Sequence, residues 1–376
     1  MMKVLHLISG GDTGGAKTHI ISLLKGLGKN IDAKVICFIE DTFYEDGLKA
    51  GINIEVYKQK ERYDLSVITR LEEEIEKENY DIIHCHGARA NTIGMLLKRK
   101  IDKPFVTTIH SDYKLDFKDN VYKRIVYTAI NSIALKKFDY YIAISNNFKK
   151  MLIDRGFDEK KIFIVYNGID LNEKIEYVNK KEFLERYNIS GENKILVGIA
   201  ARLDAVKDHE TFIKGAAEVL KKRDDVIFLI AGEGNDQKEL VSLTEKLNIS
   251  DKVYFLGFVK DQYSFFNAID INVLTSLSES FPYVILEGAR VKKPVISTNV
   301  GGIKDLIENG YNGFLIDVGD YRALSKYILN LLEDKSIIKT MGENLYNSVE
   351  EKFSSDKMVK DHIKTYNEIL KNRRQK

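Results

Sequence analysis

Two glutamates eight residues apart mark the strongest candidate for a ligand-binding site in this sequence. Glu279 lies in a polar loop that follows an apolar run, and Glu287 lies in the segment after Pro282, which we expect at the first position of a helix. The N–H groups at a helix start attract phosphate, and carboxylates accept hydrogen bonds from hydroxyls. The pattern therefore suits a nucleotide sugar, with the ribose at one carboxylate and the hexose at the other. A capping glutamate beside a solvated one would give the same spacing.

Two cations five residues apart, Arg202 and Lys207, follow the apolar run 195–201. Ligands of open α/β sheets bind at the carboxyl ends of strands, where this loop is expected to lie. An arginine fork and a lysine point charge can hold a diphosphate between them. Because surface loops often carry both residue types, the pair indicates a diphosphate site only in combination with the two glutamates.

Four glycines, Gly10, Gly11, Gly14 and Gly15, follow the first apolar run of the chain. Glycines let the backbone approach a ligand, and the helix expected after them offers N–H groups to a phosphate. An ordinary tight turn is the alternative. The spacing differs from G-x-G-x-x-G, which disfavours a dinucleotide-dependent oxidoreductase.

Three histidines end neighbouring strands: His84 and His86 close one, and His110 closes the next. Alternate residues of a strand share a face, so His84 and His86 are expected to point the same way. Zinc would need further ligands, and the neighbouring sequence supplies no fourth Cys/His group. The chain also lacks an Asp-x-Asp motif, which disfavours metal-dependent glycosyl transfer. We expect no metal site.

The elements that must position these residues alternate between short apolar runs and longer amphipathic ones, which is typical of βαβ units on parallel sheets. At 376 residues, two α/β domains are expected. A polar stretch after Val165 places the boundary between them. The domains are predicted at 1–172 and 190–350, and the chain is predicted to be helical from Tyr321 to its end. Strands are predicted at 3–8, 33–39, 52–56, 81–85, 105–109, 140–144, 162–165, 195–201, 226–231, 253–256, 271–274, 295–297 and 314–316.

Composition narrows the class of protein. Lys and Arg number 58 against 56 Asp and Glu, a net charge of +2, so the whole chain is not a nucleic-acid-binding polycation. The two cysteines, Cys37 and Cys85, have no metal or redox spacing and suit a reducing cytoplasm. The longest apolar runs are strand-sized, so neither a membrane-spanning helix nor a signal peptide is expected. Between residues 85 and 150, however, thirteen Lys/Arg face five Asp, a local net charge of +8.

With these features together, the sequence resembles glycosyltransferase family 4, a group of retaining, nucleotide-sugar-dependent enzymes. The resemblance runs through nearly the whole chain and is most specific at Glu279-x7-Glu287 and at Arg202 with Lys207. It implies the GT-B fold, in which two doubly wound, Rossmann-like domains face each other across a cleft. Residues 1–172 would be the acceptor side and 190–350 the donor side, with a terminal helix at 355–372 returning to the first domain.

The resemblance also implies roles for individual residues. Arg202 and Lys207 would grip the donor diphosphate, and Glu287 the ribose. Glu279 would hold the donor sugar together with the backbone around Ser280 and Phe281. Gly14 and Gly15 would touch phosphate from the opposite domain, and His110 would lie against the sugar at the reaction centre. A serine at position 280, where the family usually has glycine, bears on which sugar fits.

The expected function is that of a cytoplasmic, metal-independent, retaining glycosyltransferase that requires no cofactor. It would move a sugar from a nucleotide sugar, expected to be a UDP-sugar, to a glycan or lipid-linked acceptor in cell-surface polysaccharide or glycoconjugate biosynthesis. The basic stretch would place the first domain against an anionic membrane, unless it is an ordinary solvated face or a groove for an anionic acceptor. Two alternatives remain: a nucleotide-sugar epimerase of the same architecture, and a non-catalytic nucleotide-sugar-binding protein.

Overall fold

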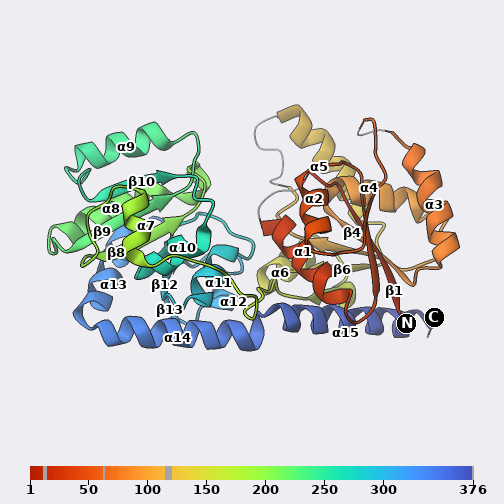
Figure 1. The fold of residues 1–376 in the computed structure, drawn as a ribbon. Coiled ribbons are helices and arrows are strands. Elements are labelled where there is room, and N and C mark those ends of the chain that lie inside the picture. The colour runs from red at the N-terminus through yellow and green to blue at the C-terminus, as the bar shows by residue number, and fades with distance from the viewer. Residues whose placement is uncertain (12–14, 62–63, 115–120, 375–376) are drawn as a thin grey trace. The chain divides into compact units, whose positions relative to one another are not determined.

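Two parallel sheets organise the chain (Figure 1). The computed structural model describes residues 1–11, 15–61, 64–114 and 121–374, with the backbone alone at 121–127. The chain divides into two compact units. Unit 1 contains Met1–Asp170 and Ser354–Lys376, and unit 2 contains Leu171–Phe353.

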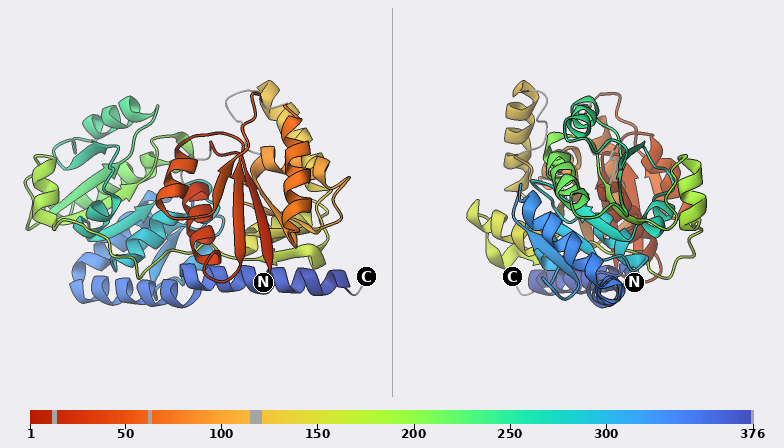
Figure 2. Two further views of the ribbon diagram at one scale, coloured as in Figure 1. Left: turned by 45° about the vertical axis from the view of Figure 1, so that its right-hand side comes forward. Right: turned by 90° about the vertical axis from the view of Figure 1, so that its left-hand side faces the viewer.

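Unit 1 is a doubly wound α/β unit whose seven strands are all parallel, in the order β3-β2-β1-β4-β5-β6-β7. Helices cover both faces of this sheet (Figure 2). The strand order reverses between β1 and β4, so their carboxyl ends form a topological switch point, where ligands bind in open α/β sheets. The strands are β1 (Lys3–Ile8), β2 (Asp32–Cys37), β3 (Ile54–Val56), β4 (Ile82–His86), β5 (Phe105–Ile109), β6 (Tyr140–Ala143) and β7 (Ile162–Ile164). The helices before α15 are α1 (Gly15–Leu27), α2 (Thr42–Lys49), α3 (Ser66–Glu78), α4 (Gly87–Leu97), α5 (Val121–Leu135), α6 (Asn146–Asp154) and the short η1 (Glu159–Lys161).

The C-terminal helix α15 (Ser355–Arg374) belongs to unit 1 and lies beside α1 (Figure 1). Its apolar face brings Val359 and the fully buried Tyr366 into the core. A side chain at Gly26 of α1 would collide with Val359, so glycine permits this close helix contact. The last helix of the chain is therefore part of the first unit's core.

Unit 2 repeats the architecture with six parallel strands, in the order β10-β9-β8-β11-β12-β13. Its order reverses between β8 and β11, which again defines a switch point. The strands are β8 (Ile195–Ala200), β9 (Val226–Ala231), β10 (Val253–Gly257), β11 (Ile271–Leu274), β12 (Val295–Thr298) and β13 (Gly313–Ile316). The helices are α7 (Lys180–Arg186), η2 (Ala205–Lys207), α8 (His209–Leu220), α9 (Gln237–Lys246), α10 (Gln262–Ala268), α11 (Tyr283–Arg290), α12 (Ile303–Leu306), α13 (Tyr321–Glu333) and α14 (Lys335–Lys352).

Each predicted strand is present, but several bounds and helix ends differ. The strand predicted at 52–56 begins only at Ile54, and the one predicted at 33–39 ends at Cys37. The helical C-terminal region is broken into α13, α14 and α15: the extended Asp334 ends α13 and caps α14, and Phe353 and Ser354 separate α14 from α15. Pro282, predicted at the first position of a helix, is instead the N-cap of α11, with extended backbone. Among the described residues, no helix is long and apolar enough to cross a membrane.

Candidate functional site

In unit 2, the loops after β8 and β11 meet at the switch point and pair Lys207 with Glu279. Lys207 Nζ lies 2.5 Å from Glu279 Oε1, and the two side chains are 19% and 10% exposed. Thr275 connects the loops, because its hydroxyl donates to the backbone oxygens of Lys207 and Asp208 at 3.0 and 2.9 Å. The structure therefore brings together one predicted cation and one predicted carboxylate, 72 residues apart in the chain.

Glu279 is held from two further directions. The Ser276 hydroxyl donates to Glu279 Oε1 at 2.6 Å. Behind the loop, Gly301 has a φ of +56°, and any side chain there would collide with the Glu279 backbone oxygen. The N–H of Gly302 donates to the Ser280 oxygen at 3.0 Å. Gly301 thus positions the candidate loop, a role that the sequence did not reveal because the contact joins two separate βα loops.

The start of α11 lies directly after this loop. Pro282 occupies the N-cap and offers no side-chain oxygen to the first turn. Phe281 is buried and packs on Phe353, with ring centroids 5.4 Å apart. The helix start is thereby fixed in place, and the electrostatics of a helix N-terminus favour an anion there.

Glu287, one turn further along α11, lies in a different environment from Glu279. It lies near the phenol groups of Tyr263 and Tyr283, whose pKa values are raised by burial and, to a smaller extent, by the charge of Glu287. Burial raises the pKa of Glu287 itself to about 7. Its carboxyl group therefore changes charge near neutral pH, and its ionised form gains from hydroxyl donors.

Arg202 follows β8 but does not join the Lys207–Glu279 pair. Its side chain is 79% exposed, and it forms an ion pair with Asp204 at 3.0 Å. The backbone on either side is fixed, because side chains at Gly232 and Gly234 would collide with the oxygens of Ala201 and Leu203. An exposed guanidinium on a rigid loop is free to swing toward a bound anion.

In unit 1, the glycine loop and the histidines lie at the carboxyl ends of β1, β4 and β5. Gly15 begins α1, whereas Gly14 lies outside the described residues. Gly10 has a φ of +96°, and a side chain there would meet the Ile39 oxygen. His110 follows β5, and its Nε2 lies 3.1 Å from Nδ1 of His86.

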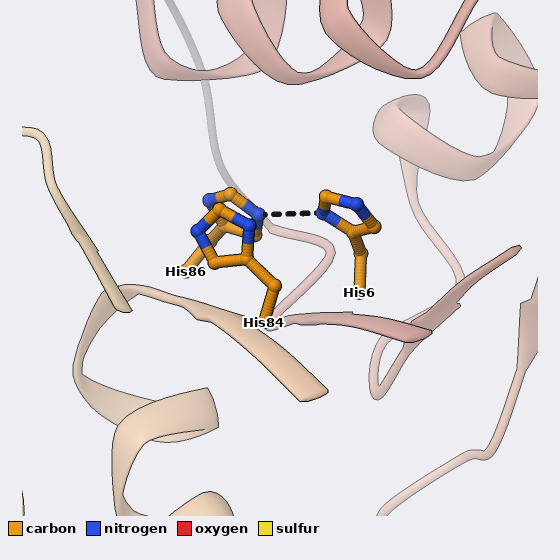
Figure 3. Close-up of side chains that lie close together, drawn as sticks. All are labelled: His6, His84 and His86. Carbon is orange, nitrogen blue, oxygen red and sulfur yellow. Dashed lines mark hydrogen bonds between the residues drawn. The ribbon is translucent and has the colours of Figure 1, made fainter. Parts of the chain in front are cut away.

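Behind His110 lies a cluster of buried histidines that the sequence analysis found only in part. Nε2 of His86 lies 3.0 Å from Nδ1 of His6, which faces it from the neighbouring strand (Figure 3). His84 has both ring nitrogens engaged, by the Tyr366 hydroxyl at 2.7 Å and the Thr108 hydroxyl at 2.8 Å. In all, six of the seven histidines lie within ring contact of one another: His6, His19, His84, His86, His110 and His362.

The cluster is uncharged at neutral pH. Burial, with a smaller contribution from His362, lowers the pKa of His6 to about 3 and that of His110 to about 4. Burial likewise lowers the pKa values of His19, His84 and His86 well below their usual range. Nitrogens of His6, His84 and His86 lie within 4.8 Å of one another, a grouping that could accommodate a metal ion. Both nitrogens of His84 and both of His86 are engaged in the hydrogen bonds described above, whereas Nε2 of His6 has no partner among the described residues.

The two doubly wound units, each with polar side chains at its switch point, have the architecture of GT-B glycosyltransferases. Two family models divide the chain: "Glycosyltransferase Family 4" matches residues 13–173, and "Glycosyl transferases group 1" matches residues 179–348. The chain belongs to glycosyltransferase family 4.

Curated relatives agree with that assignment, and solved structures share the fold. N-acetyl-alpha-D-glucosaminyl L-malate synthase of Bacillus anthracis is 30% identical over 82% of this chain and 80% of its own length. UDP-Gal:alpha-D-GlcNAc-diphosphoundecaprenol alpha-1,3-galactosyltransferase of Escherichia coli is 27% identical over 80% and 78%. Anabaena HepE, solved in complex with UDP, superposes with a TM-score of 0.83 at 24% identity, covering 98% of this chain and 100% of its own.

Proposed function

We propose that this glycosyltransferase transfers a sugar, with retention of configuration and without a metal ion, from a UDP-sugar to a glycan or lipid-linked acceptor. Unit 2 binds the donor and unit 1 the acceptor, in cytoplasmic synthesis of cell-surface polysaccharide or glycoconjugate. The observation that carries the proposal is the Lys207–Glu279 pair at the switch point of unit 2, directly before the N-terminus of α11. Such a site offers a cation and a helix start to a diphosphate and a carboxylate to a sugar.

The chemistry follows from these groups. As the sugar–phosphate bond breaks, negative charge grows on the leaving diphosphate, and Lys207, Arg202 and the start of α11 stabilise it. Glu279, held by Lys207 and Ser276, accepts hydrogen bonds from the sugar. Glu287 accepts hydrogen bonds from the ribose. Because cations of the protein supply the charge compensation, neither a metal ion nor another cofactor is required, and transfer proceeds on one face of the sugar within an ion pair.

The donor and acceptor classes are supported by relatives. The similar E. coli enzyme is named for UDP-galactose and a diphosphoundecaprenol-linked acceptor. The similar HepE structure has also been solved with UDP-glucose, at a TM-score of 0.81 and 24% identity over 98% of this chain and all of its own. These names favour a UDP-sugar over other nucleotide sugars.

The test is a panel of UDP-, GDP-, ADP- and dTDP-sugars incubated with the purified chain, with and without EDTA. We expect slow hydrolysis of one or more UDP-sugars, unchanged by EDTA, with NMR showing that the released sugar first appears in the donor's anomeric configuration. Loss of activity in EDTA that Mg²⁺ or Mn²⁺ restores would contradict metal independence. Conversion of one UDP-sugar into its epimer would indicate the epimerase, and binding without turnover the non-catalytic protein.

Replacing Arg202 with alanine is expected to slow transfer without destabilising the fold. The side chain is largely exposed, so the free energy of unfolding should change by less than about 0.5 kcal/mol. A charge-assisted contact that strengthens as the leaving group becomes charged should cost about ten- to a hundredfold in kcat. Arg223→Ala is the matched control. It also removes an Arg–Asp pair, but Arg223 precedes β9 and so lies at the amino ends of the strands, opposite to the candidate site. Equal rates in the two variants would refute the role of Arg202.

We also propose that unit 1 binds anionic membranes through its basic stretch. Part of that charge is neutralised, since Lys98, Lys100 and Lys149 pair with Asp139, Glu72 and Glu159. Near the end of α5, however, Lys136 and Lys137 are exposed, and Ile133 is 58% exposed beside them. Basic residues near an anionic surface contribute about 1 kcal/mol each, so this patch gives reversible attachment.

Co-sedimentation with vesicles tests the membrane proposal. We expect binding to phosphatidylglycerol vesicles and none to phosphatidylcholine vesicles. Lys136→Glu with Lys137→Glu should weaken binding about tenfold or more. Lys335→Glu with Lys339→Glu, which changes the same charge on exposed positions of α14, should not. Absence of binding to either vesicle at low ionic strength would exclude the proposal.

A further inference from the structure

Three histidine rings form a continuous hydrogen-bonded chain that ends at His110. His6 Nδ1 lies 3.0 Å from His86 Nε2, and His86 Nδ1 lies 3.1 Å from His110 Nε2 (Figure 3 shows the first of these bonds). His6 and His86 are at most 1% exposed. The hydrogen-bonded chain thus runs from the interior of unit 1 to His110, which the family resemblance places at the reaction centre.

Neutral imidazole carries one N–H donor and one acceptor nitrogen, so the chain has only two self-consistent arrangements. In the outward arrangement, His6 donates to His86, His86 donates to His110, and His110 carries its proton on Nδ1. In the inward arrangement every bond reverses, and His110 carries its proton on Nε2. Because each ring constrains the next, the state of His6 sets the state of His110.

His6, at the buried end of the hydrogen-bonded chain, determines which of the two arrangements is favoured. His6 Nε2 is buried and has no hydrogen-bond partner among the described residues. The inward arrangement would make it an N–H donor without an acceptor, whereas the outward one leaves it an unpaired lone pair. Orphaned buried N–H groups are the rarer of the two in proteins, so the outward arrangement is favoured.

We propose that His6 and His86 are positioning residues that hold His110 in the tautomer with its proton on Nδ1, so that His110 presents a neutral hydrogen-bond donor to a bound substrate. The proposal rests on the proposed function for the identity of the ligand. The tautomer of His110 does not depend on the proposed function, because it follows from the contacts of unit 1 alone. Since His86 occupies Nε2 of His110, Nδ1 is the nitrogen left for a substrate.

A metal ion on His6, His84 and His86 is the competing use of the same side chains. His6 could supply its unpartnered Nε2, but both nitrogens of His84 are engaged by Tyr366 and Thr108, and both nitrogens of His86 by His6 and His110. A metal bound to His86 would therefore break either the His6–His86 or the His86–His110 hydrogen bond. Elemental analysis of the purified protein therefore belongs to the test.

The first experiment reads the tautomers directly, by long-range ¹H–¹⁵N correlation spectra of the full chain labelled with ¹⁵N-histidine. Signals are assigned by single substitutions. We expect the proton of His6, His86 and His110 on Nδ1 in each ring, at neutral pH and without substrate. A His110 proton on Nε2, or one equivalent of zinc, nickel or copper bound to the protein, overturns the proposal.

The second experiment measures whether the hydrogen-bonded histidine chain contributes to the rate of sugar transfer. His86→Leu removes both bonds and should lower kcat about tenfold, while UDP affinity, which unit 2 supplies, stays unchanged. His86→Gln, which can accept from His6 and donate to His110, should restore most of the rate. His362→Leu is the matched control, because His362 is equally buried in the cluster but bonds only to the Met358 backbone oxygen. Equal loss of rate in the leucine variants at positions 86 and 362 refutes a positioning role.

The two experiments separate this inference from the proposed function. If the protein turns over no nucleotide sugar, the proposed function fails, but the tautomer measurement still tests the arrangement of the histidines independently. If transfer is observed but His110 carries its proton on Nε2, the inference fails and the glycosyltransferase assignment is untouched.

Discussion

Lowering the pH from 7 to 5 is expected to unfold unit 1 while unit 2 stays folded. Five histidines of unit 1 are at most 1% exposed, and burial keeps each of them uncharged: His6, His19, His84, His86 and His362. In the unfolded chain each has a pKa near 6.5. Below that pH the unfolded state binds protons that the folded state excludes.

The sign and size of the effect follow from this difference. Groups whose pKa is lowered by folding contribute no penalty above pH 6.5, and the folded state loses stability as the pH falls from 6.5 toward about 4. At pH 5 each buried histidine costs about 2 kcal/mol, so the five cost about 10 kcal/mol together. That is comparable with the whole unfolding free energy of a typical domain, about 5–15 kcal/mol. Unit 2 contains one histidine, His209, and is affected far less.

Hydrogen–deuterium exchange read by mass spectrometry locates the unfolding, since the chain contains no tryptophan to report it by fluorescence. After correction for the intrinsic pH dependence of exchange, peptides of β1, β4 and α15 should lose protection between pH 6.5 and 5, and those of β8 and β11 should keep it. His362→Leu removes one titrating group and should lessen the pH dependence by about 1.4 kcal/mol per pH unit. Protection in unit 1 that is constant from pH 7 to 5 would contradict the prediction.

The strands and covering helices of both units could be predicted from the sequence, because the patterns that specify them are local. Alternating apolar runs and amphipathic segments specify parallel strands and covering helices within about thirty residues, and each predicted strand is present in the structure. Arg202, Lys207, Glu279 and Glu287 could be proposed as ligands because their positions relative to strand ends are visible in the chain. Their assigned roles stay predictions.

The histidine cluster shows what local patterns cannot predict. His84 and His86 stood out because they are two residues apart, but His6, His19 and His362 each stand alone in the sequence. They meet only because β1 pairs with β4 in a register that sets His6 against His84, and because α15 returns beside α1. Gly301 likewise shows its role only when the loops after β11 and β12 are seen in contact. A signal was available in the composition, because six of seven histidines fall in the segments that build unit 1.

The two glutamates of unit 2 are expected to respond in opposite ways to the same substitution. Glu287→Gln should stabilise the protein, because burial raises the pKa of Glu287 to about 7 and the ionised carboxyl is therefore costly in the folded state. Glu279→Gln should destabilise it by about 1–2 kcal/mol, because Lys207 would lose its partner at a site where both side chains are largely buried.

The stabilisation by Glu287→Gln carries its own pH signature. A carboxyl whose pKa is raised by folding costs nothing below the unfolded value of 4.5, and the cost grows up to about pH 7 and is constant above it. The variant should gain about 2–3 kcal/mol at pH 8, and less at pH 6. Urea unfolding at pH 6, 7 and 8, followed by exchange in peptides of unit 2, measures the difference. An equal gain at all three pH values would mean that the ionisation of Glu287 is not its cause.

UDP affinity is expected to distinguish Glu287 from Glu279 as well. If Glu287 accepts hydrogen bonds from the ribose, Glu287→Gln should weaken the affinity for UDP about tenfold, and UDP binding to the unaltered protein should weaken as the pH falls below about 7. Glu279→Gln should leave UDP affinity nearly unchanged and depress transfer, since its partner in the complex is the sugar, which UDP lacks. Calorimetric titration with UDP and turnover of the UDP-sugar give both quantities for each variant. Equal losses of UDP affinity in the two variants would contradict this division, whereas a more stable Glu287→Gln protein that binds UDP poorly would show that the site keeps a destabilising, partly buried carboxylate for the nucleotide.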